Sequence, residues 1–423
     1  MMNFRSRVAS ALLLAGSLLT LPVLAADPEV IALKAARLID VESGKWIDAP
    51  VVIIEGERIK AVGSRLAVPQ GARVIDLGER TLLPGLIDAH VHIAGGGGPN
   101  AGVARSALKG AANAKKTLEA GFTTVRSMGG GSFAGIALRD AINDGDVVGP
   151  RIFDAGTLLA VTGGHCSGPR LAPGVSVESP GVADDAAGFV RKVREQVKYG
   201  ADFIKICITG GFVSGTDPTT TQFTEEEVRA VVETAHRYGK KVAVHAHATD
   251  GVKLAARLGA DSIEHGSLID DEGIRLIKGN PKQVVVPTLS VYGTALDRAK
   301  AVGASPSALV QLQRVLEVYE GNARKIVKAG IPVIYGTDGP PGNNASEFPL
   351  LVGLGLSPLQ VLQSATIRSA EFLGVASDIG SVGAGKYADI IAFDSDPLAD
   401  IEQFRQVRWV MKGGVVHKDI TSR

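Results

Sequence analysis

The chain has little charge imbalance and few aromatic side chains, and both shortages exclude classes of partner. Its 45 Lys and Arg residues against 44 Asp and Glu residues leave a formal net charge of +1, so no basic surface favours nucleic acid or an anionic membrane. Aromatic residues make up 5% of the 423 residues, too few to favour stacking platforms for single strands. The composition is that of an ordinary globular chain with one large domain or two.

Cysteine is almost absent. Two cysteines, Cys166 and Cys207, cannot form the disulfide framework of a small secreted protein. Although an exported protein could join them, free cysteine is among the most often buried residues. We therefore expect two free buried thiols in preference to a bridge.

Long uncharged apolar runs are absent apart from one near the start. Arg5 and Arg7 precede the run VASALLLAGSLLTLPV, and the small residues Ala25 and Ala26 follow shortly after it. This layout predicts a secretory signal peptide over residues 1–25, because the run is shorter than the ~20 residues of a membrane-spanning helix. We expect a periplasmic or secreted protein that has no membrane span after cleavage.

Two β-rich terminal segments flank a long segment of alternating strands and helices. Residues 26–83 and 377–423 contain short alternating runs with Gly-rich turns and no helical period. Between them, over residues 84–376, eight apolar runs alternate with helical stretches, in the length and order of a (β/α)8 barrel. Because exposed strand edges tend to be paired, we predict an α/β fold in which a TIM-like barrel carries a small β-sandwich built from both terminal segments.

The helical stretches carry start signals. Thr224 with Glu227 three residues later predicts a capping box, and Gly239 predicts the end of that helix. SPSALVQLQRVLEVYEGNARKIVKAG, from residue 305, and SPLQVLQSATIRSAEFLG, from residue 357, place proline at the first helical position. We expect one helix over each of these two stretches.

Ionisable side chains stand where the predicted barrel strands end, and barrels of this kind place active sites there. Five of the eight histidines and one carboxylate hold such positions: His90, His92, His245, His247, His265 and Asp338. Alternate residues of a strand share a face, so the histidine pairs in HVH and HAH can each bind a metal ion. Two histidines alone could also occupy such positions by chance.

Lys205 lies inside the predicted strand FIKICI, residues 203–208. Ile204 and Ile206 should face the helices, so Lys205 should face the barrel interior. A fully buried lysine is rare unless paired, and beside two cations its amine would have to be neutral or modified. Carbamylated by carbon dioxide, it becomes an anion able to bridge two metals. The alternative is a lysine that extends to water at the barrel mouth.

This set resembles the amidohydrolase superfamily, and within it the bacterial Xaa-Pro dipeptidase (prolidase) and imidazolonepropionase-like branch. The motifs that carry the resemblance are LLPGLIDAHVH, IKICITGG, TEEEVRAVVETAHRYGKKVAVHAHATDGVKLAARLGADSIEHG, VVPTL, GTD and GKYADIIAFDSDPLADI. They span nearly the whole chain that follows the predicted signal peptide. The chain is also similar to ochratoxinase, which cleaves a phenylalanine amide of a mycotoxin.

The resemblance implies a binuclear metal site. Its ligands would be His90, His92, carbamylated Lys205, His245, His265 and Asp338. The HVH histidines and Asp338 would bind the more buried ion, the two later histidines the second ion, and the lysine would bridge them. His245 is preferred to His247 because the family's ligand lies 20 positions before the histidine of EHG. Nitrogen and oxygen ligands suit zinc, with manganese, cobalt or nickel as alternatives.

The implied activity is hydrolysis of a C–N amide bond in a dipeptide or an N-acyl amino acid. Two ions about 3.5–4 Å apart would activate a bridging hydroxide and polarise the carbonyl oxygen, with Asp338 as the catalytic base. His165, His247 and Tyr292 follow predicted strands and are expected to contact the substrate, although each could instead be structural. The resemblance also implies a homo-oligomer.

Two other functions stay open. A single-metal cyclic amide hydrolase or deaminase is the first; deaminases place an acidic residue just after the HAH histidine, HAHATDG offers none there, and the single-metal branch lacks the strand lysine. The second is a catalytically inactive exported binding protein, which the six filled ligand positions disfavour.

Overall fold

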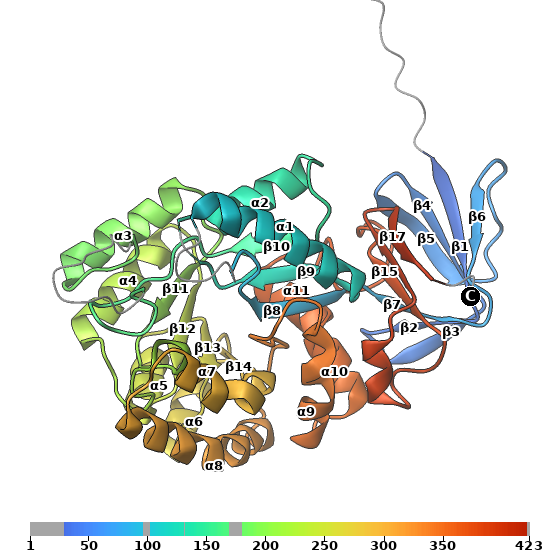
Figure 1. The fold of residues 1–423 in the computed structure, drawn as a ribbon. Helices are drawn as coiled ribbons and strands as arrows, with labels where there is room; N and C mark the ends of the chain where they lie inside the picture. The colour runs from blue at the N-terminus through green and yellow to red at the C-terminus, as the bar shows by residue number, and fades with distance from the viewer. Residues whose placement is uncertain (1–28, 96–101, 131, 169–179, 421–423) are drawn as a thin grey trace, which may run out of the picture.

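The structure, a computed structural model, describes residues 29–95, 102–130, 132–168 and 180–420. The predicted signal peptide lies outside the described residues. Figure 1 shows a barrel surrounded by helices, with a group of sheets beside it. Within the described ranges, no helix combines the length and apolar character needed to span a bilayer.

Seven strands of the barrel run parallel and form two sheets, of three and four strands. They are β8 (Leu86–Val91), β9 (Phe122–Ser127), β10 (Arg151–Asp154), β11 (Ile204–Cys207), β12 (Val242–Ala246), β13 (Ser262–His265) and β14 (Val284–Val286). Parallel strands covered by helices are buried on both faces, which explains their near-continuous apolar sequences.

Extended segments join the two sheets into a closed barrel. After β10, the Leu159 NH donates to the Lys205 carbonyl (2.9 Å), and the Cys207 NH donates to the Leu159 carbonyl (3.0 Å). At the other seam, residues 332–338 run beside β14 and are also hydrogen-bonded to β8. The Asp338 NH donates to the carbonyl of His90 in β8 at 2.7 Å. These residues take the place of the eighth predicted strand.

The helices are α1 (Val103–Glu119), α2 (Ala134–Asn143), α3 (Ala186–Lys198), α4 (Glu225–Arg237), α5 (Thr249–Arg257), α6 (Asp271–Lys278), α7 (Ala295–Ala301), α8 (Pro306–Lys328), α9 (Glu347–Gly353), α10 (Pro358–Ser364) and α11 (Ile367–Leu373). The expected capping box is present at α4. The Glu227 NH donates to the Thr224 hydroxyl (3.3 Å), and the Thr224 NH donates to the Glu227 carboxylate (2.8 Å).

The single helix expected from residue 357 is wrong, because the chain forms α10 and α11 with a break between them. Thr366 has a non-helical backbone at φ −138° and ψ −101°. The preceding carbonyl, of Ala365, accepts a 2.7 Å hydrogen bond from the Ile87 NH of β8. This tertiary hydrogen bond fixes the break to the barrel, and the sequence pattern contains no sign of it.

Both ends of the chain contribute to the neighbouring sheets. One sheet has the order β5-β4-β1-β6 and the other β17-β16-β15-β7-β2-β3. The strands are β1 (Val30–Lys34), β2 (Arg37–Asp40), β3 (Lys45–Asp48), β4 (Pro50–Glu55), β5 (Arg58–Ser64), β6 (Arg73–Asp76), β7 (Thr81–Pro84), β15 (Ile390–Phe393), β16 (Trp409–Lys412) and β17 (Val415–Asp419).

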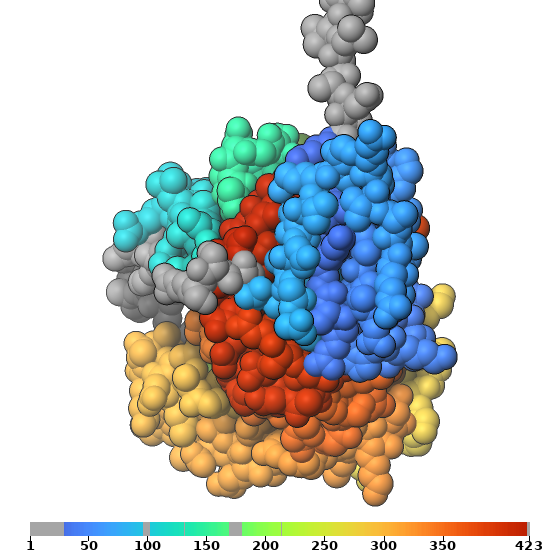
Figure 2. Space-filling view, turned by 90° about the vertical axis from the view of Figure 1, so that its right-hand side faces the viewer, coloured from blue at the N-terminus to red at the C-terminus, as the bar shows by residue number. Residues whose placement is uncertain are grey.

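The join between the two ends is the antiparallel pair β15–β7, with Ile390 opposite Pro84. Figure 2 shows the early (blue) and late (red) segments side by side on this face of the molecule. Leu33, Leu38 and Trp409 are among the buried residues of a core that both segments share. The predicted α/β fold, a barrel with a sheet domain from both terminal segments, is confirmed.

The two cysteines form a disulfide, so the expectation of free thiols is wrong. Cys166 and Cys207 are 41 residues apart in sequence, and their Cα atoms are 6.2 Å apart. Cys207 ends β11, and Cys166 lies in the turn after the segment that hydrogen-bonds to β11. Closure of the barrel makes the two residues neighbours, and composition carries no information about that closure.

Candidate metal centre

The strand-end residues converge at the carboxyl end of the barrel strands. The ring centroids of His245 and His265 are 4.6 Å apart, and those of His90 and His265 are 5.2 Å apart. The Asp338 Oδ1 atom lies 3.5 Å from His92 Nε2 and 3.9 Å from His90 Nε2. The predicted ligands from four different strands therefore face one small volume.

Among the strand-end side chains, two sets have ligand atoms that all lie within 4.8 Å of one another. One set is His90, His265 and Asp338, and the other is His245, His247 and His265. Because His265 belongs to both, the sets are adjacent and could hold neighbouring ions. The choice of His245 over His247 as ligand stays a prediction, since the second set contains both.

Hydrogen bonds orient the first two imidazoles. His90 Nδ1 lies 2.7 Å from the Glu264 carboxylate, and His92 Nδ1 lies 2.9 Å from the Gly129 carbonyl. Both partners accept, so each Nδ1 carries the proton and each Nε2 presents its lone pair. The two lone pairs face Asp338, which is the arrangement that a metal ligand requires.

The backbone is strained at two of the predicted ligands. His265 has φ 73° and Asp338 has φ 50°, values that residues with a side chain rarely adopt and that cluster at functional sites. His265 Nδ1 donates to the Thr288 hydroxyl at 2.7 Å, because that hydroxyl gives its own proton to the Pro287 carbonyl. The imidazole is thereby held with Nε2 directed into the centre.

Glu264 and Arg126 form a buried ion pair behind His90, which our sequence analysis missed. Arg126 donates to the Glu264 carboxylate at 2.8 Å and to the Ala89 carbonyl at 2.7 Å. Burial would raise the pKa of Glu264, but the Arg126 charge and the His90 hydrogen bond outweigh it and hold that pKa below its usual range. A carboxylate next to a ligand in a strand should point away from it. The left-handed backbone of His265 breaks that alternation.

Glu264→Gln should weaken metal binding by about 10- to 100-fold, because it removes the charged acceptor that orients His90. Metal affinity can be measured by competition with a chromophoric chelator. Glu227→Gln is the matched control, since it changes a mostly buried glutamate in the α4 capping box. Equal affinities for wild type and Glu264→Gln would show that the carboxylate plays no part in holding the ion.

Lys205 is 2% exposed, and its Nζ atom has no hydrogen-bond partner among the described residues. Burial lowers the pKa of this amine to about 8. A buried ammonium without a hydrogen-bonded partner is strongly unfavourable. The position therefore fits a neutral or modified amine that can ligate a metal ion, and it does not fit a lysine that reaches water at the barrel mouth.

Known proteins are similar to this chain in sequence and in fold. Residues 81–416 match the Amidohydrolase family. The chain belongs to that family. Ochratoxinase from Aspergillus niger is 30% identical over 431 residues, which cover 94% of this chain and 89% of that protein. An imidazolonepropionase from Fusobacterium nucleatum is 27% identical, covering 82% and 86%. The crystal structure of a Xaa-Pro dipeptidase with bound methionine in the active site has a TM-score of 0.85, at 34% identity over 92% of this chain and 100% of that chain.

Membership of the family makes the protein a hydrolase of C–N bonds and confirms the predicted resemblance. Divalent metal ions are general in amidohydrolases, and the two histidine sets are compatible with such ions. The roles of the individual residues stay predictions.

The three predicted substrate residues of this amidohydrolase lie in or beside the histidine sets. His165 has its ring centroid 4.2 Å from that of His245. His247 Nδ1 lies 2.6 Å from the Ser267 hydroxyl, which is also 2.6 Å from the Tyr292 hydroxyl. All three side chains are buried. A chain of hydrogen bonds thus links His247 and Tyr292 through Ser267, while the His165 ring lies against His245.

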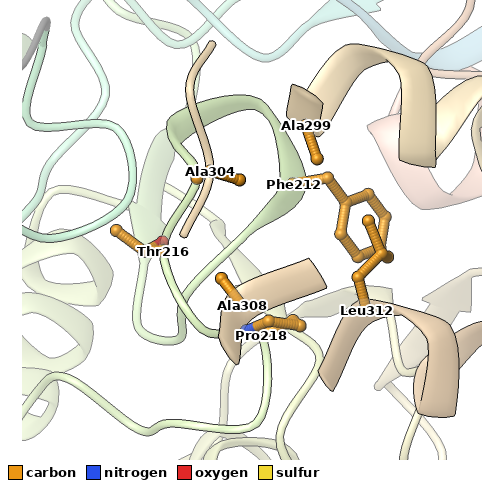
Figure 3. A pocket seen from close by; sticks show the side chains of 8 residues that line it. Phe212, Thr216, Pro218, Ala299, Ala304, Ala308 and Leu312 are labelled. Atoms are coloured by element: carbon orange, nitrogen blue, oxygen red, sulfur yellow. The ribbon is translucent and has the colours of Figure 1, made fainter. Parts of the chain in front are cut away.

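Phe212, in the short helix η1 (Phe212–Ser214), is a neighbour of these residues that sequence patterns did not indicate. Its ring stacks on His247 with centroids 4.4 Å apart. Figure 3 shows it beside a recess formed with Ala299, Ala304 and Leu312. That recess has no space for a water molecule, so it is packing that fixes the phenyl ring against His247 and is no substrate pocket.

Proposed function

We propose that this amidohydrolase is an exported, homo-oligomeric enzyme that uses two divalent ions, zinc first, to cleave an amide bond in a dipeptide or an N-acyl amino acid. The observation that carries the proposal is the convergence of five histidines and Asp338 close enough to Lys205 to feel its charge, while the buried Lys205 nitrogen has no hydrogen-bond partner among the described residues. His90, His92 and Asp338 would hold one ion and His245 with His265 the other. The export signal is the segment 1–25.

Lys205 is proposed to bridge the two ions in its carbamylated form. Its neutral amine would attack carbon dioxide, forming an N–C bond and releasing one proton. A pKa of about 8, lowered by burial, keeps more of the amine neutral near pH 7 than an ordinary lysine would have. The product is an anion, which suits a position beside two cations better than an ammonium does.

Asp338 is proposed to act as the base. Ions held at the centre would polarise the amide carbonyl and lower the pKa of water. Burial would raise the pKa of Asp338, but the electrostatic effect of its neighbours, His90 and His92 first, outweighs burial and holds that pKa below the usual range. The carboxylate is therefore ionised at neutral pH, ready to accept a proton from the attacking water and to pass it to the leaving amine.

The carboxylate of an amino-acid product is proposed to face Arg298 of α7. The positive charge of Arg298 contributes to lowering the pKa of both His165 and Asp338. No ion pair joins Arg298 to a carboxylate within the described part of the chain. Methionine in the active site of the similar dipeptidase and the similarity to ochratoxinase also support an amino-acid product.

The test is a screen of metal-loaded protein against dipeptides and N-acyl amino acids, each paired with its C-terminal amide. We expect substrates with a free C-terminal carboxylate to release free amino acid. The paired C-terminal amides should react at least about 10-fold more slowly, because they lose a charged hydrogen bond, which is worth ~1.5–3 kcal/mol. Hydrolysis confined to cyclic amides, or release of ammonia alone, would favour the single-metal alternative. Binding without turnover of any member would favour the inactive binding protein.

A further inference from the structure

The Cys166–Cys207 disulfide connects two parts of the candidate centre. Cys207 lies two residues beyond Lys205 on β11, and Cys166 directly follows His165 in the turn formed by residues 161–168. Cys207 is fully buried, whereas Cys166 is partly exposed. The bond therefore ties the turn that carries His165 to the strand that carries the predicted bridging lysine.

The turn's own backbone hydrogen bonds are short-range. The Gly164 NH donates to the Val161 carbonyl at 3.0 Å. Two side chains of other segments also hold the turn: the Asp184 carboxylate accepts from Thr162, and Gln222 accepts from the His165 NH at 2.9 Å. Because local bonds of this kind open easily in a surface turn, the covalent bond is the strongest restraint on where the turn sits.

Backbone strain at the bonded residue supports a positioning role. Cys166 has φ 71°, a conformation that a residue with a Cβ avoids unless its surroundings enforce it. The disulfide can hold Cys166 in this backbone conformation, because it fixes the Cys166 side chain to Cys207, a fully buried strand residue. Without the bond, the strained backbone would be free to relax and to carry its neighbour His165 with it.

The His165 ring occupies a site with little spare room. Its Nδ1 atom lies 2.7 Å from the Ser214 hydroxyl, and its ring lies against His245. A Cβ placed on Gly211 would come within 2.6 Å of the ring, so this approach requires a glycine. The side chain is 6% exposed. A small shift of the turn would remove the ring from this position.

We propose that the Cys166–Cys207 disulfide is a positioning element that holds His165 beside His245, so that its reduction lowers catalytic efficiency and leaves the bound metal in place. Reduction by a phosphine breaks the S–S bond and gives two thiols, while the phosphine takes an oxygen atom from water and becomes a phosphine oxide. Export would keep the bond formed, since disulfides persist in oxidising compartments. The kinetic part of this inference rests on the proposed function.

The kinetic test is a double-mutant cycle with His165→Ala, Cys166→Ala and the double variant. We expect Cys166→Ala to lower kcat/KM by about 10- to 100-fold, the effect of displacing a group by about 1 Å. If the disulfide acts through His165, the double variant is no slower than His165→Ala. Effects that multiply in the double variant would overturn the proposal. A phosphine reductant should slow the wild type and leave Cys166→Ala unchanged.

A second measurement does not depend on activity. Diethyl pyrocarbonate should modify His165 slowly in the oxidised protein and at least about 5-fold faster after reduction or in Cys166→Ala, as read by peptide mass spectrometry. His236 on α4, whose side chain is 43% exposed, is the internal reference. Equal rates at His165 in both states would overturn the proposal. If reduction speeds the modification of His165 in a protein that has no amidase activity, the positioning role of the disulfide is supported. Only the proposed function is then refuted.

Metal content decides between positioning and a competing explanation. The His165 nitrogen and the two sulfur atoms lie within 4.8 Å of one another, so the reduced thiols could bind an ion of their own. We expect the metal content to stay the same on reduction by the phosphine. A gain of one ion per chain that accompanies the loss of activity would overturn the proposal, because inhibition would then come from the new ion.

Discussion

Asp338→Asn should lower kcat by about 10²–10⁴-fold while most of the metal remains bound. Asparagine keeps the size of the side chain and one acceptor oxygen, but it cannot take a proton from the attacking water. KM should change much less, because the proton transfer matters in the transition state and not in substrate binding. Metal content and kinetics must be measured on one preparation, since lost metal would mimic lost chemistry.

Asp261→Asn is the matched control for this change. Asp261 lies just before β13, at the opposite end of the barrel, and its carboxylate accepts hydrogen bonds from the Val242 NH and His236. We expect near wild-type kcat from it. A metal-replete Asp338→Asn enzyme with wild-type kcat would show that another residue is the base, with His247 and His165 the first to test.

Lys205→Ala should remove at least one ion per chain and lower kcat by about 10³-fold or more, since the Lewis-acid contribution of a bound metal is worth several kcal/mol. The substitution leaves a space at the buried end of the side chain, where the carbamate is proposed to stand. Formate, acetate or propionate in the medium could enter that space and supply a carboxylate ligand. We expect them to restore part of the activity and of the metal content.

Lys241→Ala serves as the control for the lysine substitution. Lys241 is a half-buried lysine just before β12, again at the far end of the barrel, and it donates to the Phe372 carbonyl. Its removal should leave the metal content unchanged. Near-normal activity of Lys205→Ala without any added acid would refute a bridging lysine.

The sequence predicts much of the barrel because its signals are local. Apolar strands, proline at helix starts and the capping box at Thr224 each depend on residues close in the chain. The convergence of the strand-end side chains was also predictable, since the carboxyl ends of parallel strands must meet at one end of a barrel. The structure accordingly brings His90, His265 and Asp338 together.

Features that depend on contacts between distant segments were not predictable. The disulfide requires a turn after β10 to meet the end of β11, and the break before α11 is fixed by a hydrogen bond to β8. Glu264 and His265 can both face the centre only because the left-handed backbone of His265 breaks the alternation of side chains. Periodicity describes which face a residue takes along a regular strand, and it carries no information where the strand loses its regularity.

The proposed binuclear centre is tested most directly by a metal titration of the metal-free enzyme, in which zinc is added stepwise and amide hydrolysis is followed at each step. A binuclear centre predicts that activity rises until about two ions are bound per chain and then stays constant. Full activity at one ion per chain, or in the presence of excess chelator with no bound metal, would contradict the binuclear centre.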